Sequence, residues 1–296
     1  MIQIPVTPAQ LRTAINTRDS NWYRKAKDTL ATLPANPTSK QFVSLWSGIK
    51  SVWTTLQNSK CIYCESLLEG DISRDIEHFR PKAKVSVWKV PKRLQQEGVT
   101  VTPSAGPKGD IGYRHLAYDP WNYAASCKVC NSVLKKNYFP ISGRRRSGST
   151  DARGMSSEGS LFILPIGDID EDPAELIRFV GMHPEPVAPK GSHEFHRALV
   201  VLEVFQLNDA DRRKELFQAR GLQLRALFNE LENLRTARTA SIRNAAQEWI
   251  DFYVSPRCPH SSCMRSFVVV YQNNRNRAKQ LMEQAQTFIH TGSLPA

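Results

Sequence analysis

The sequence lacks a long apolar segment and has no recognisable export signal. The longest apolar run that we considered is residues 267–271. It is far shorter than the roughly 18 residues that a membrane-spanning helix needs. The first ten residues have neither a basic start nor the apolar stretch that follows it in a secretion signal. From these absences we expect a cytoplasmic protein that does not enter a membrane.

Acidic residues are also scarce. The 296 residues include 40 Lys and Arg but only 28 Asp and Glu, which gives a net charge of +12. Such an excess favours polyanionic partners, because Lys and Arg release counterions when they neutralise phosphates. A basic protein that is merely soluble would have the same composition, so charge alone leaves nucleic-acid binding open. The length suffices for one large domain or two ordinary ones.

The six cysteines are few, but four of them stand in two CxxC pairs. Disulfides are rare in a reducing compartment. Because the two thiolates of a CxxC turn can reach one ion, Cys61/Cys64 and Cys127/Cys130 can together complete a tetrahedral zinc site. One pair alone would equally suit a redox motif. Two pairs on either side of an acidic–histidine motif favour one structural zinc that joins two distant segments.

A third pair, Cys258 and Cys263, encloses His260. These three side chains could hold a second metal if a fourth ligand came from elsewhere in the chain. The alternative is two buried free thiols, since cysteine is among the most buried residue types. The sequence leaves both interpretations open.

The pattern of apolar residues divides the chain into four regions. Apolar residues recur at helical steps of three and four between residues 42 and 56, behind a capping-box pattern at Thr38 and Gln41. Similar steps recur at residues 224–234, 242–253 and 278–289, whereas residues 161–167 resemble a short buried strand. We therefore predict an α+β protein, mostly α, with an N-terminal helical region at 1–59, a small β-containing domain at 60–140, a mobile Gly-, Ser- and Arg-rich linker at 141–160 and a C-terminal helical region at 161–296.

Residues 74–82, RDIEHFRPK, carry the acidic–histidine motif. On a strand, Asp75 and Glu77 share one face and His78 lies on the other, and a bend at the strand end would let Glu77 and His78 converge on one phosphate. Phosphodiester hydrolysis can use such a pair, a carboxylate that holds a hard cation and an uncoordinated neutral imidazole that deprotonates water. A surface histidine beside acidic residues gives the same pattern. For Asp75, three roles stay open: orienting His78, joining the metal shell or facing solvent.

A second polar group follows the second CxxC pair. If a helix begins there, Asn131 and Lys135 lie one turn apart on the same face. Asn131 would then offer an amide oxygen to a metal, and Lys135 would offer a cation to a phosphate. A helix cap and a solvated lysine are the alternatives.

Together these segments resemble a known family. The order CIYCE, DIEHFRPK, LAYDPWNY, SCKVCNS and KKNYFP, within residues 60–140, resembles the zinc-containing branch of the HNH (ββα-metal) endonucleases. It is more closely similar to the HNH nuclease component of retron- and Septu-type anti-phage systems. The resemblance implies a small ββα-metal nuclease domain with a four-cysteine zinc site, flanked by helical regions. A Glu at the first metal-ligand position and the long insertion at residues 83–112 depart from the family pattern and leave the metal preference open.

The resemblance also assigns roles to individual residues. His78 matches the general base, and Glu77 and Asn131 match the ligands of a catalytic Mg²⁺ or Mn²⁺. Asn122 matches the central Asn that steadies the loop bearing the base, and the four CxxC cysteines match the structural zinc ligands. The implied function is a metal-dependent endonuclease that hydrolyses DNA, acting as the effector of an anti-phage system beside an ATPase partner that releases its activity.

Two other functions are compatible with the sequence. One is a non-catalytic, zinc-dependent nucleic-acid-binding protein, and the other is an HNH ribonuclease, because the site acts on the phosphate and not on the base. In each case we expect nucleic-acid contacts from the basic residues in and behind the motif, which are Arg80, Lys82, Lys135, Lys136, Arg144, Arg145 and Arg146.

Overall fold

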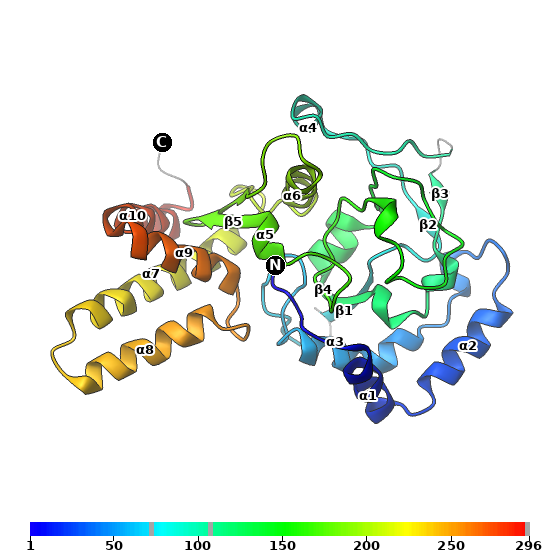
Figure 1. Cartoon of the computed structure of the whole chain (residues 1–296), viewed down its shortest axis with the longest axis horizontal. Helices are drawn as coiled ribbons and strands as arrows, with labels where there is room; N and C mark the ends of the chain where they lie inside the picture. The colour runs from blue at the N-terminus through cyan, green and yellow to red at the C-terminus, as the bar shows by residue number, and fades with distance from the viewer. Residues whose placement is uncertain (71–73, 106–108, 294–296) are drawn as a thin grey trace.

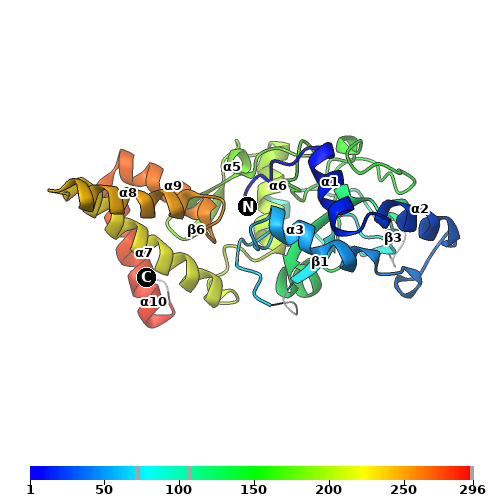
Figure 2. The same ribbon diagram turned by 90° about the horizontal axis from the view of Figure 1, so that it is seen from below.

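The computed structural model describes residues 1–70, 74–105 and 109–293. It is rich in helix and contains three small two-stranded sheets, which confirms the predicted α+β, mostly α class. The molecule is elongated (Figures 1 and 2). The helices α7–α10 form one end, α1 and α2 form the other, and the strands β1 and β4 lie between them.

The N-terminal region is helical, as predicted, but its helices are short. Thr7 and Gln10 form a capping box at the start of the first helix, and Thr38 and Gln41 form the predicted one at the start of a 3-10 turn. The elements are α1 (Pro8–Arg18), α2 (Trp22–Thr32), the 3-10 turns η1 (Ser39–Gln41) and η2 (Leu45–Ile49), and α3 (Lys50–Leu56).

The acidic–histidine motif forms a strand, the geometry that we assumed for it from the sequence. This strand, β1 (Arg74–His78), pairs antiparallel with β4 (Tyr123–Cys127), so that Asp75 lies opposite Ser126 and His78 opposite Tyr123. The chain then enters η5 (Val129–Lys135), a π-helical turn in the place of the helix expected after the second CxxC pair. Helix α3 packs against both strands. The order along the chain is therefore strand, strand, helix.

The connection between β1 and β4 contains the insertion at residues 83–112. Its residues 106–108 lie outside the described part of the chain. The remainder forms a short strand pair and one short helix, and two 3-10 turns then lead into β4. These elements are β2 (Lys84–Val85), α4 (Lys92–Gln96), β3 (Asp110–Ile111), η3 (Arg114–Leu116) and η4 (Pro120–Asn122).

Residues 141–160 differ from the mobile linker expected from their composition. A bridge between Ile141 and Ser160 joins the two ends of the segment, and a 3-10 turn, η6 (Ser156–Glu158), lies near its C-terminal end. The Glu158 side chain is fully buried and accepts hydrogen bonds from Arg80 Nε at 2.9 Å and from the Tyr113 hydroxyl at 2.8 Å. Because a buried arginine needs a carboxylate, this ion pair holds the segment in place.

Residues 161–167 do not form the predicted strand. The apolar residues 161–164 are buried, but the only β-bridge described in this stretch joins Ile166 to Ile4 in parallel. The apolar run is thus explained by burial and not by a sheet, an ambiguity that short apolar runs carry.

The C-terminal region is helical, as predicted, and its apolar core is continuous with that of the rest of the protein. Among the described residues, no helix is both long and apolar enough to cross a membrane. The elements are α5 (Pro173–Leu176), the hairpin β5 (Ile177–Val180) and β6 (His183–Pro186), α6 (His193–Val204), α7 (Lys214–Thr236), α8 (Ala240–Val254), α9 (Ser261–Asn273) and α10 (Arg275–Thr291).

Candidate active site and zinc centre

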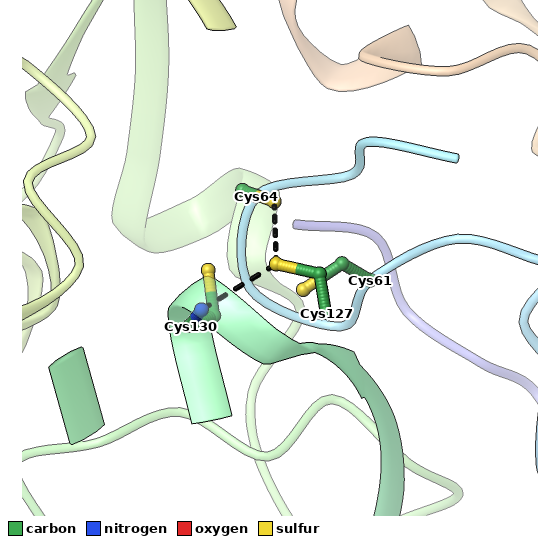
Figure 3. A group of neighbouring side chains, drawn as sticks. All are labelled: Cys61, Cys64, Cys127 and Cys130. Carbon is green, nitrogen blue, oxygen red and sulfur yellow. Dashed lines mark hydrogen bonds between the residues drawn. The ribbon is translucent and has the colours of Figure 1, made fainter. Parts of the chain in front are cut away.

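The two CxxC pairs meet in space. All four sulfur atoms lie within 4.8 Å of one another, and Cys64 Sγ lies 3.9 Å from Cys127 Sγ (Figure 3). Four thiolates around one zinc, each bonded at about 2.3 Å, are about 3.8 Å apart. The Cys130 amide also donates to Cys127 Sγ at 3.4 Å. The donor set therefore fits one zinc ion, and the predicted clamp between residues 61–64 and 127–130 is present.

The thiols influence one another within this cluster. Hydrogen bonds with Cys127, Cys130 and Cys61 hold the pKa of Cys64 well below its usual value. Three of the four side chains are buried, and Cys127 is partly exposed. Burial raises the pKa of Cys61 well above its usual value, and hydrogen bonds with the other thiols do the same for Cys130, so it is the metal ion that would make all four sulfur atoms thiolates.

The C-terminal region supports the cysteine cluster through residues that sequence reasoning did not assign to it. His260 Nδ1 donates to the Cys64 carbonyl at 3.1 Å. Burial opposes the charge of Arg213, but attraction to Cys130, Cys64 and Cys127 raises the pKa of its guanidinium above the usual value. A tetrathiolate zinc site carries excess negative charge, which a nearby arginine offsets. His260 stands in the segment between Cys258 and Cys263, which the sequence suggested as a separate metal site, and Arg213 stands in no motif.

The suggested second metal site is not formed. In the described residues, Cys61, Cys64, Cys127 and Cys130 are the only group of three or more His, Cys, Asp or Glu side chains with metal-binding separations. Cys263 Sγ instead donates to the Gly181 carbonyl at 3.2 Å, and Cys258 is buried with its thiol free. Of the two interpretations that the sequence left open for Cys258, His260 and Cys263, the structure therefore favours two buried thiols over a second metal site.

His78 stands at the end of β1 and is only 8% exposed. Its Nε2 lies 3.1 Å from the Ala117 carbonyl oxygen. Because a carbonyl can only accept, Nε2 carries the hydrogen, and Nδ1 keeps an unprotonated lone pair in the neutral ring. Burial, and after it the positive charges of Lys82 and Lys135, lower the pKa of His78 well below its usual value. The imidazole is therefore neutral near pH 7, the state that a general base requires.

Asn122 links the two backbone segments that hold His78. It is fully buried, and its Oδ1 accepts from the Arg80 amide at 2.8 Å. Its Nδ2 donates to the carbonyls of Arg80 at 3.0 Å and Leu116 at 3.2 Å. The segment that follows His78 is thus joined to the turn that supplies the Ala117 carbonyl. This geometry suits the steadying role that the resemblance assigns to Asn122.

The two expected ligands of a catalytic cation are not directed at one ion. Glu77 is 2% exposed and forms an ion pair with Lys135, whose side chain is fully buried and whose Nζ also donates to the His78 carbonyl at 3.2 Å. Asn131 Nδ2 lies 3.4 Å from Asp75 Oδ2. Mg²⁺ needs oxygen ligands at about 2.1 Å, and the Glu77 carboxylate is already neutralised by an ammonium group. In this arrangement the residues do not fit a divalent cation.

The basic residues expected to contact nucleic acid fall into two groups. Arg80 and Lys135 are buried in ion pairs, and Arg145 is held by Asp110 at 2.9 Å and by the Tyr113 hydroxyl at 2.8 Å. Their charges therefore serve the fold. The side chains that reach solvent are the half-buried Lys82 and the exposed Lys136, Arg144 and Arg146, together with Lys128, which sequence reasoning did not single out.

The chain is similar to the Septu protein PtuB of Bacillus mycoides (strain KBAB4). The two proteins are 25% identical over 234 residues, which cover 79% of this chain and 71% of that protein. No protein-family model matches the chain, and no solved structure matches it. The similarity supports the Septu relation that the motifs indicated.

Proposed function

We propose that this protein is a nuclease that hydrolyses phosphodiester bonds of DNA and acts as the effector of an anti-phage defence system. The observation that carries the proposal is the state of His78, a neutral imidazole with Nε2 fixed on the Ala117 carbonyl and Nδ1 unprotonated. The strand, strand, helix order of β1, β4 and η5 around it is the order that a ββα-metal domain requires. The similarity to a Septu protein supports the defence role and a partner protein, for which an ATPase is our candidate.

In the proposed reaction, His78 Nδ1 accepts a proton from a water molecule as the water oxygen attacks phosphorus. The bond from phosphorus to the 3′ oxygen breaks, and that oxygen leaves with the electron pair. The Ala117 carbonyl holds the Nε2 hydrogen and stabilises the imidazolium that forms. Asn122 keeps the carbonyl and the base in one geometry, and the zinc clamp holds β4 and η5 to the segment before β1.

The first test is cleavage by the purified protein. We expect nicking of supercoiled plasmid with added Mg²⁺ or Mn²⁺ and none with excess EDTA, because the resemblance implies a metal-dependent reaction. The zinc content should be measured in the same samples, since a chelator that also removes structural zinc would stop cleavage by unfolding the protein. Parallel reactions with single-stranded DNA and with RNA identify the substrate. Cleavage of RNA alone would replace the DNA assignment.

A second candidate function is supported by the ion pair between Glu77 and Lys135. In this pair the carboxylate expected to bind the metal is bound to an ammonium group instead. A zinc-dependent nucleic-acid-binding protein without catalysis would keep that pair permanently. Nucleic-acid binding without cleavage under every metal condition, both alone and with the partner ATPase, would favour this second function over the first.

Nucleic-acid affinity should fall steeply with salt, because binding through phosphates releases counterions. Replacing the exposed Arg144 and Arg146 with Gln should reduce the slope of log affinity against log salt by about 0.9 for each duplex phosphate that the protein no longer neutralises. Arg145→Gln is the matched control, because its guanidinium is bound to Asp110 and Tyr113. We expect it to lower the melting temperature and to leave the slope unchanged. If the slope of log affinity against log salt is unchanged in the double variant, residues 144–146 do not contact phosphates and their role is structural.

A further inference from the structure

The proposed base is covered by a residue from the N-terminal region, to which the sequence assigns no chemistry. The Trp46 ring stands edge-on to the His78 ring, with centroids 4.6 Å apart and an interplanar angle of 90°. On its other side, the His78 ring contacts Tyr123, with centroids 4.9 Å apart. The His78 ring therefore has two aromatic neighbours, and only 8% of the residue is exposed to solvent.

Trp46 belongs to a segment that is fixed at both ends and exposed between them. Phe42 and Ile49 are buried, whereas Val43, Ser44, Ser47 and Gly48 are exposed. The segment lies on the surface, with the Trp46 side chain turned toward the site.

Side chains from elsewhere in the chain hold the backbone of this segment, and one of them is Arg18, whose Nε donates to the Gly48 carbonyl at 3.3 Å. The Tyr118 hydroxyl donates to the Val43 carbonyl at 3.0 Å, and Trp22 Nε1 donates to the Leu45 carbonyl at 3.0 Å. The rings of Tyr118 and Trp46 are stacked, with centroids 6.0 Å apart. These contacts join exposed backbone to a few side chains, the kind of region in which local opening costs less than global unfolding.

Lys82 connects the segment to the charged part of the site. Its Nζ lies 4.7 Å from the centroid of the Trp46 ring, and the charge of Glu77 acts on the same ammonium group. A cation over an aromatic face is attracted by the negative charge of the ring face. A phosphate group that approaches the site would compete with the ring for Lys82, because it offers the ammonium a full negative charge.

We infer that residues 42–49 form a lid over the active site, closed by Trp46, and that this lid must open before a phosphodiester can reach His78. The inference rests on the proposed function of His78 as the base. It gives the N-terminal region a regulatory role: the site is closed in the isolated chain, and an approaching nucleic-acid backbone favours opening by drawing Lys82 away from Trp46.

The lid can be tested without measuring cleavage, by labelling the full-length protein with diethyl pyrocarbonate at neutral pH and following each histidine by mass spectrometry. In the parent protein, His78 should react far more slowly than the exposed His290. Trp46→Ala should raise the His78 rate at least about tenfold, because minor open states are typically about 0.1–10% populated. Tyr118→Phe, which removes only the hydrogen bond to Val43, should raise it about two- to tenfold.

Two controls make the result decisive. His260 is 3% exposed, and its slow labelling reports that the fold is intact. Trp249→Ala removes a tryptophan that is 52% exposed on α8 and should leave His78 protected. If Trp46→Ala also speeds the labelling of His260, that variant has disturbed the fold. The test then rests on the His78 rate of the milder variant, Tyr118→Phe. A His78 rate that stays at the parent value while His260 stays protected would overturn the lid.

Cleavage by the same variants separates the lid from the proposed function. If both are correct, Trp46→Ala should nick plasmid faster than the parent protein. Faster labelling of His78 without cleavage by any variant would support the lid and count against the nuclease. Cleavage by the parent protein with no gain in labelling for either variant would support the nuclease and overturn the lid.

Discussion

Cys127→Ser is expected to release the zinc ion and to lower the melting temperature by on the order of 10 °C. A serine hydroxyl is a poor zinc ligand, and a structural zinc site contributes its binding free energy directly to folding. Losing even about 4 kcal/mol would produce this change, at about 2–4 °C for each kcal/mol in a protein of this size. Elemental analysis and a thermal melt on the same sample measure both effects.

Cys258→Ser is the matched control for this variant. Cys258 is buried, like three of the four zinc ligands, but it does not belong to the four-cysteine cluster. The control protein should keep one zinc per chain, whereas Cys127→Ser should keep none. Zinc retained by Cys127→Ser, or an iron–sulfur absorbance in the parent protein, would contradict the assignment.

The parts of the fold that could be predicted are those whose signal is local. The steps of Leu224, Leu227, Leu231 and Leu234 predicted α7, because a helix places residues three and four apart on one face. The strand β1 was assumed for the acidic–histidine motif and implied by the family resemblance, but its burial does not alternate, because Glu77 and His78 are both buried.

Packing decided what the sequence did not indicate. The composition of residues 141–160 predicted a mobile linker. In the structure Glu158 neutralises the buried Arg80, which lies 78 positions away in the chain, and no local pattern indicates that contact. The hairpin of β5 and β6 was missed because each strand is only 4 residues long, too short for alternation to stand out.

The candidate site divides in the same way. Each CxxC pair is a local pattern, and the meeting of the two pairs followed from the four ligands that zinc requires. The partners that set the state of the site come from other segments: Trp46 covers His78, and Lys135 neutralises Glu77. Because no spacing rule connects such residues, only the three-dimensional structure brings them together.

Replacing His78 should abolish cleavage while leaving zinc content and nucleic-acid binding nearly unchanged. Losing a general base typically costs about 10²–10⁴-fold in rate. Because the ring fills the space between Trp46 and Tyr123, His78→Ala would also leave a cavity. His78→Gln is the sharper variant, since its amide can still donate to the Ala117 carbonyl but cannot accept a proton from water near pH 7. The measurement is the rate of plasmid nicking, together with zinc content and melting temperature.

Comparison with two further variants separates the missing base from lost metal or lost packing. Glu77→Gln removes both the carboxylate that the resemblance assigns to the metal and the partner of the buried Lys135, so we expect it to lose activity and to melt earlier. Higher Mg²⁺ or Mn²⁺ should restore part of the activity if the metal assignment is correct. The same metal should restore nothing in His78→Gln, because an added cation cannot replace the proton acceptor. His115→Ala removes a half-buried imidazole two residues before Ala117 and should cut at nearly the parent rate. If His78→Gln nicks plasmid as fast as His115→Ala, His78 is not the base and the nuclease mechanism proposed for this site fails. If His78→Gln loses zinc and melts early, the histidine is structural, and its neutral, enclosed ring is explained by packing alone.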